Sequence, residues 1–131
     1  MVPVGKDRKV IWLGNDEAES RALQNLLSKH VIVTCARNIP ELLSILKGSS
    51  YDALFCDWSF NKSSWREALK EVHRRQPDLP MIVMHHSADE QEWVDVLEAG
   101  AVDLLGPPYN ERLLLELLEH VFTSREALHV A

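Results

Sequence analysis

The sequence has little cysteine and no surplus of positive charge, and both absences exclude classes of protein. Its 131 residues contain two cysteines, Cys35 and Cys56, each within an apolar run. This pattern predicts buried, reduced thiols and excludes a disulfide framework or a cysteine-based metal site. The net charge of −6 argues against direct nucleic-acid binding by this chain, because phosphate groups need a basic surface.

Glycine-rich motifs and long apolar runs are also missing. The five glycines form neither a GxGxxG pattern nor a P-loop, so the signatures of dinucleotide and nucleoside triphosphate binding are absent. No apolar stretch is long enough to span a bilayer, and the N-terminus lacks the apolar core of a signal peptide. We therefore expect a cytoplasmic protein that makes no contact with membranes.

Short apolar runs alternate with helical patterns along the whole chain. The runs predict five strands, at Val10–Leu13, Val31–Cys35, Ala53–Cys56, Met81–Met84 and Val102–Leu105. A helical pattern follows each of them, and such alternation predicts βαβ units, a parallel sheet and helices on both faces. The predicted organisation is a tail at 1–8, one α/β domain at 9–122, and a helical extension or linker at 123–131.

Three local patterns predict where helices begin and end. Ser64 with Glu67, and Ser87 with Glu90, have the spacing of a capping box at a helix start. Gly100 is placed to end the helix that begins near Ser87.

The stretch Tyr51–Phe60, YDALFCDWSF, contains the strongest candidate for a functional residue. Its apolar run suits a strand buried on both faces, and the run ends abruptly in Asp57. A carboxylate at the C-terminal end of a central parallel strand lies where open α/β folds place their chemistry. Asp57 is therefore the residue around which we expect a site.

The order of elements, the segment YDALFCD and the segment LEAGAVDLLGPPY at 97–109 resemble the receiver domain of bacterial response regulators. The resemblance covers about 9–121. It implies a flavodoxin-like (βα)5 fold of three layers with strand order 2-1-3-4-5. It further implies a signalling domain of a phosphorelay, not an enzyme, in which a histidine kinase passes a phosphoryl group to Asp57.

The acids that help the phosphoacceptor in this family are largely missing here. Receivers carry an acidic pair after the first strand, which holds Mg²⁺ together with the phosphoacceptor. By the element pattern this pair falls on Gly14 and Asn15, or on Asn15 and Asp16 if the alignment shifts by one. At most one carboxylate remains, so we expect Asp57, Asn15 and Asp16 to hold Mg²⁺ weakly.

Other family positions carry unusual residues as well. The hydroxyl residue that ends the fourth strand is replaced by His85, with His86 next to it, and the lysine near the fifth strand is replaced by Pro107. The aromatic residue of the switch corresponds to Leu104. The resemblance also implies a cis peptide bond before Pro108. We expect the site to be lined by Gly14, Trp58, His85, His86 and Pro107. Trp58 should narrow the access to Asp57.

Trp93 lies on a helix that, with the fifth strand and fifth helix, forms the usual partner and dimer surface of the family. It is either an exposed binding anchor there, together with Leu104, or packed against a neighbour.

Three functional readings remain open. The first is a phosphorylation-tuned receiver with a degenerate site, in which Asp57 is a poor phosphoacceptor. The second is a pseudo-receiver that acts by protein contact or homodimerisation. The third is a metal or small-ligand sensor built from Asp57, Asp16 and His85 or His86. The expected partner is a histidine kinase or another signalling protein.

Overall fold

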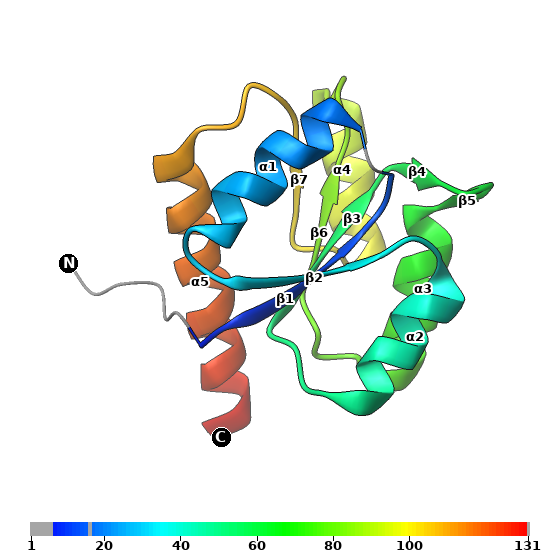
Figure 1. Ribbon diagram of the computed structural model, residues 1–131, viewed down its shortest axis with the longest axis vertical. Helices are drawn as coiled ribbons and strands as arrows, with labels where there is room; N and C mark the ends of the chain where they lie inside the picture. The colour runs from blue at the N-terminus through cyan, green and yellow to red at the C-terminus, as the bar shows by residue number, and fades with distance from the viewer. Residues whose placement is uncertain (1–6, 16, 131) are drawn as a thin grey trace.

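A computed structural model describes residues 7–15 and 17–130 of the chain, as strands and helices that alternate (Figure 1). The elements are β1 (Lys9–Leu13), α1 (Ala18–Ser28), β2 (Ile32–Ala36), α2 (Ile39–Gly48), β3 (Ala53–Asp57), β4 (Ser59–Phe60), β5 (Ser63–Ser64), α3 (Trp65–Arg75), β6 (Met81–Met84), α4 (Glu90–Ala99), β7 (Asp103–Leu105) and α5 (Glu111–Val130). The main sheet is parallel, in the order β2-β1-β3-β6-β7. Since β6 and β7 are the fourth and fifth strands of this sheet, the predicted order 2-1-3-4-5 is confirmed.

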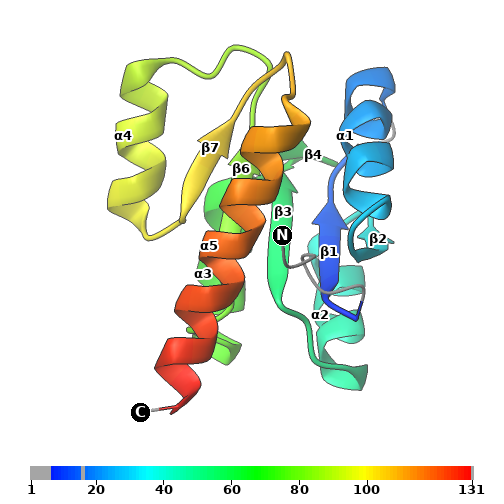
Figure 2. The ribbon, with the colours of Figure 1, turned by 90° about the vertical axis from the view of Figure 1, so that its left-hand side faces the viewer.

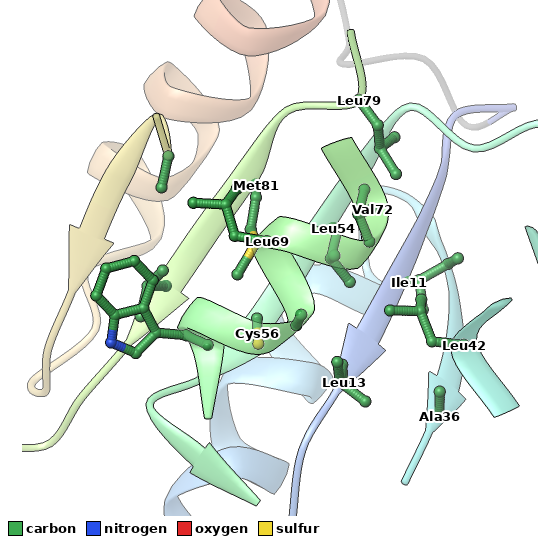
Figure 3. Packing of buried hydrophobic residues seen from close by; sticks show 14 of the residues in the cluster. Ile11, Leu13, Ala36, Leu42, Leu54, Cys56, Leu69, Val72, Leu79 and Met81 are labelled. Carbon is green, nitrogen blue, oxygen red and sulfur yellow. The ribbon is translucent and has the colours of Figure 1, made fainter. Parts of the chain in front are cut away.

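Two apolar layers enclose the sheet because successive strand residues point to opposite faces. On one face, Ile11 and Leu54 join buried side chains of α2, α3 and α4. On the other, Trp12 and Phe55 join buried side chains of α1 and α5. Figure 3 shows the first layer, with Leu69 of α3 close to the strand side chains. The central strands are covered on both sides, and their buried carboxyl ends provide a rigid support for a site.

Helix α4 starts two residues later than the sequence pattern indicated. Its N-cap is Asp89, which accepts a hydrogen bond of 2.8 Å from the backbone N–H of Glu92 and forms a complete capping box with it. The box predicted at Ser87 and Glu90 is wrong, because an acceptor that suits the N-cap equally well lies closer to the helical run. Gly100 ends the helix with φ 111°, as predicted.

The segment after β3 forms a small hairpin that the sequence pattern did not predict. Strands β4 and β5 pair antiparallel across Asn61 and Lys62, whose φ angles are 41° and 65°. The hairpin leads directly into α3. Ser64 occupies the N-cap there without making a side-chain cap, so the predicted capping box is wrong. Ser63 donates its hydroxyl to Glu67 at 2.6 Å instead.

The two cysteines differ in their exposure. Cys56 is buried in β3, whereas Cys35 is exposed on β2, so the prediction that both are buried is wrong. The reason is that β2 lies at the edge of the sheet, where fewer elements cover it.

Towards the C-terminus, α5 continues through 123–130. None of the helices in the described ranges combines the length and the apolar character needed to cross a membrane. The predicted tail at 1–8 falls mostly outside the described residues.

Candidate functional site

Asp57 lies at the carboxyl end of the sheet, as predicted. It is the last residue of β3, which pairs with β1 and β6, and its register partner on β6 is Met84. The carboxylate opens on a hollow of about 170 Å³. The lining residues are Asn15, Glu17, Ser20, Asp57, Trp58, Ser59, Met84, His85, His86 and Tyr109. The hollow therefore brings together the ends of β1, β3 and β6 with the start of α1.

The side chain of Asp57 rests on the backbone at Gly14 and Asn15. Its Oδ2 atom accepts a hydrogen bond of 2.8 Å from the backbone N–H of Asn15. A Cβ atom added at Gly14 would collide with the same oxygen. The carboxylate of Asp57 thus occupies the space that a side chain at position 14 needs. The side-chain amide of Asn15 donates to the carbonyl of Ser59 at 3.1 Å and holds the hairpin beside the site.

Burial raises the pKa of Asp57 to about 6. The backbone hydrogen bond from Asn15 acts in the opposite direction, and the nearby negative charge of Glu17 raises the pKa further. Glu17 was not among the predicted site residues. Its only sequence signal is its place as an acid at the start of a helix, which has an ordinary capping explanation. The predicted ligand Asp16 lies outside the described residues.

His85 belongs to an aromatic and charged network beside the hollow. Its ring stacks on Trp58 with a centroid distance of 4.4 Å and an interplanar angle of 12°. Its Nδ1 atom lies 3.0 Å from the carboxylate of Glu92. Trp58 in turn contacts the buried ring of Trp65, with a distance of 5.5 Å between the ring centroids. His85 therefore connects the residue after Asp57 with the capping box of α4.

The structure places the residues predicted to line the site in different positions, and Gly14 lies against the Asp57 carboxylate and is not among the residues that line the hollow. Trp58, His85 and His86 line the hollow, with His86 at the edge of the His85 ring at 4.8 Å. Pro107 does not line it, because its short ring lacks the reach of the lysine that the family has there, and Tyr109 is found instead. The bond between Pro107 and Pro108 is cis, which confirms that prediction.

The family model for the response regulator receiver domain matches residues 11–119. The chain belongs to the response regulator receiver domain family, the receiver modules of two-component systems. The DNA-binding transcriptional regulator NtrC of Escherichia coli K12 is 25% identical to this receiver over 118 residues, which are 88% of this chain and 25% of that protein. The receiver thus spans about a quarter of the length of such a relative.

Solved structures show the same fold at low sequence identity. The signal receiver domain of an HD domain-containing protein from Pseudomonas fluorescens Pf-5 has a TM-score of 0.81 and 18% identity, covering 98% of this chain and 96% of that one. The beryllofluoride-activated NtrC4 receiver domain dimer has a TM-score of 0.79 and 17% identity, covering 89% and 98%. At these identities the likeness establishes the receiver fold alone.

The donor atoms around Asp57 suit a hard cation such as Mg²⁺, the ion that receiver domains bind at the phosphorylation site. Two carboxylates, Asp57 and Glu17, line the same hollow and repel each other, and Mg²⁺ is bound by one or two carboxylates with water. Within 7–15 and 17–130, no group of three or more His, Cys, Asp or Glu side chains is arranged to hold a metal. His85 is paired with Glu92 instead.

The surface of α4, β7 and α5 carries Trp93 as an exposed side chain. Trp93 is 45% exposed, and its indole N–H donates to Asp103 at 2.9 Å. Leu104, predicted to share this surface, is only 7% exposed and packs in the core. That prediction is wrong because side chains alternate along β7, so that Leu104 faces inward between Asp103 and Leu105.

Proposed function

We propose that this receiver domain has a degenerate phosphorylation site and signals chiefly by protein contact through α4, β7 and α5. Asp57 is then a weak phosphoacceptor or none. The observation that carries the proposal is that the Asp57 carboxylate occupies the space of a side chain at Gly14. Gly14 is one of the positions that correspond to the acidic pair of the family. We place the domain in the cytoplasm, with a histidine kinase or another signalling protein as its partner.

Electrostatics supports weak phosphoryl transfer. The reaction depends on positioning and on neutralising the charge of the phosphoryl oxygens. Among the described residues that line the hollow there is no lysine or arginine, and Pro107 has no ammonium group to offer. Losing one such donor in a comparable oxyanion site costs on the order of 3 kcal/mol, or roughly a hundredfold in rate. Mg²⁺ held by Asp57 and Glu17 would supply positive charge and orient phosphate oxygens, with fewer carboxylates than the family pattern provides.

Residual phosphorylation is the second candidate, and one observation favours it. Asp57 still opens on the hollow and is only partly buried, so a small phosphodonor has a path to the carboxylate. A receiver tuned by slow phosphorylation would use the same residue with a low yield.

Intact-mass measurement after incubation with acetyl phosphate and Mg²⁺ tests the proposal. We expect little or no phosphoryl adduct compared with a typical receiver treated in parallel. A nearly complete adduct that disappears in Asp57→Asn would refute the degenerate site. The gain-of-function variant Pro107→Lys sharpens the test, because restoring an ammonium group should increase an adduct that depends on Asp57.

A second measurement uses beryllium fluoride and Mg²⁺ with NMR spectra of the backbone amides. The NtrC4 receiver in the comparison was solved in a beryllofluoride-activated form. We expect amide shifts of α4, β7 and α5 to stay unchanged here. Large shifts across these elements would indicate a phosphate-driven switch and contradict the proposal.

A further inference from the structure

Strand β2 forms one edge of the main sheet, next to β1 and in contact with helices α1 and α2 (Figure 2). On its other side, no strand of the described residues pairs with it. The backbone N–H of Ile32 donates to the carbonyl of Arg8, just before β1, at 2.9 Å. Because the backbone groups of successive strand residues point to alternate sides, those of Val33 and Cys35 point away from β1. The outer edge of β2 therefore has the geometry to extend the sheet.

The two edges of the sheet differ in the features that keep natural edge strands from pairing. Strand β7, at the other edge, has three residues and carries the charged Asp103. Strand β2 has five residues, IVTCA, without a charge or a proline, and it pairs with β1 without a bulge. Its Ile32 side chain is 50% exposed. Charges, prolines, bulges and short length are the usual protection of an edge, so β2 is open to another strand and β7 is not.

A second copy of the chain supplies a strand that matches this edge. Two β2 strands that run antiparallel about a two-fold axis at Thr34 place Val33 of each copy opposite Cys35 of the other. Since both residues point their backbone groups outward, each such pair can exchange two hydrogen bonds, about four in all. The same register places the exposed Ile32 opposite Ala36 of the other copy, so an apolar side chain leaves water on each side of the axis.

The charge that flanks β2 favours the antiparallel arrangement. Arg37 directly follows the strand and is exposed. In an antiparallel pair the two Arg37 residues lie at opposite ends, about 20 Å apart at roughly 3.3 Å per residue. A parallel pair would bring them side by side. A two-fold contact of this kind is also closed, because each copy uses the same edge and offers no further one of that kind.

We propose that this receiver forms a homodimer by antiparallel pairing of the β2 edges. The pairing joins the five-stranded sheets of two copies into one continuous sheet. The inference goes beyond the proposed function, because it involves neither Asp57 nor the surface of α4, β7 and α5.

Sedimentation velocity over protein concentrations of about 0.01 to 0.5 mM, a range that detects weak association, tests the dimer. We expect a dimer whose population rises with concentration. Ile32→Lys should raise the dissociation constant about tenfold or more, because a charge on an edge strand opposes its pairing. Leu113→Lys makes the same kind of change at an exposed position of α5 and should leave the dissociation constant unchanged. Circular dichroism checks that both variants are folded.

Thr34→Cys in a Cys35→Ser background tests the register. On the two-fold axis, position 34 forms a pair without hydrogen bonds, whose Cα atoms are about 4.5 Å apart. A disulfide accepts Cα distances of about 4.4 to 6.8 Å, so mild oxidation should link most chains as dimers on a non-reducing gel. Val33→Cys in the same background is the matched control. The two copies of position 33 are diagonal neighbours about 7 to 8 Å apart and should crosslink poorly.

Three outcomes overturn the inference. The first is a mass of one chain at every concentration. The second is a dimer that Ile32→Lys leaves unchanged or that Leu113→Lys dissociates, which would assign the contact to another surface. The third is a Thr34→Cys variant that crosslinks no better than Val33→Cys. A phosphoryl adduct on Asp57 would contradict the degenerate site and leave the dimer standing, because that carboxylate takes no part in it.

Discussion

At the carboxyl end of the sheet, aromatic side chains pack against one another, whereas on the surface of α4, β7 and α5 a tryptophan is exposed to solvent. Trp65 is 2% exposed and contacts Trp58, which stacks on His85, and the Asp57 carboxylate lies over Gly14. Trp93 is 45% exposed on that surface. The difference is that the rings at the site end are packed against one another, while the Trp93 side chain is open to solvent. Mutations that affect the two regions differently can break or sharpen this contrast.

The largest effect is expected for Trp65→Ala. Truncating a buried tryptophan should lower the free energy of unfolding by about 3 to 5 kcal/mol, because the transfer free energy is lost and a cavity remains. Trp93→Ala is the matched variant on the surface of α4, β7 and α5 and should cost about 1 kcal/mol or less. Urea unfolding followed by circular dichroism measures both. Equal costs for the two tryptophans would remove the contrast between the regions.

Gly14→Ala should lower the free energy of unfolding by about 1 to 3 kcal/mol, since the added methyl group meets the Asp57 carboxylate. In an Asp57→Ala background most of this cost should disappear, because the obstructing oxygen is gone. Gly48→Ala serves as the control, since nothing lies within 4 Å of a Cβ atom added there. If the cost at Gly14 persists without the carboxylate, another contact explains the glycine.

Asp57→Asn should stabilise the protein at pH 7 to 8. Because the folded-state pKa of Asp57 is raised, the folded protein holds a proton that the unfolded chain has lost between about pH 4 and 6, and stability falls as pH rises through this window. The raised pKa corresponds to at most about 3 kcal/mol, which partial exposure reduces to about 1 to 2 kcal/mol.

The gain from Asp57→Asn should therefore be complete above pH 7 and vanish as pH falls towards 4. Urea unfolding at several pH values measures it, with Glu119→Gln as a control of equal charge change at an exposed position. A gain independent of pH would contradict the assigned cause.

The smallest effect is expected at His85. His85→Ala removes the stack on Trp58 and the pair with Glu92, and should cost about 1 kcal/mol. A double-mutant cycle with Glu92→Ala should give a coupling energy of about 0.5 to 1.5 kcal/mol. The exposed neighbour His86 provides the control, and His86→Ala should change stability by less than about 0.5 kcal/mol. A coupling near zero would show that the histidine does not connect the site to α4.

The sequence by itself determined the layered architecture and the place of Asp57. Both follow from short-range patterns: apolar runs that alternate with helical spacing, and one acid at the end of the most apolar run. The physical reason is that a strand buried on both faces needs continuous apolar side chains. A short run of adjacent residues is therefore enough to locate the strand and its polar end.

Only the tertiary structure decided which residues surround that acid. Asp57 contacts Gly14 and is repelled by Glu17, although both are distant from it in the chain. His85 pairs with Glu92 because the start of α4 brings that side chain back towards the end of β6. The exposure of Cys35 and the burial of Leu104 likewise depend on which strand lies at an edge and which face it turns inward. Close approach and burial arise from packing between strands and helices. A local sequence pattern does not specify which side chains of other elements pack against a residue.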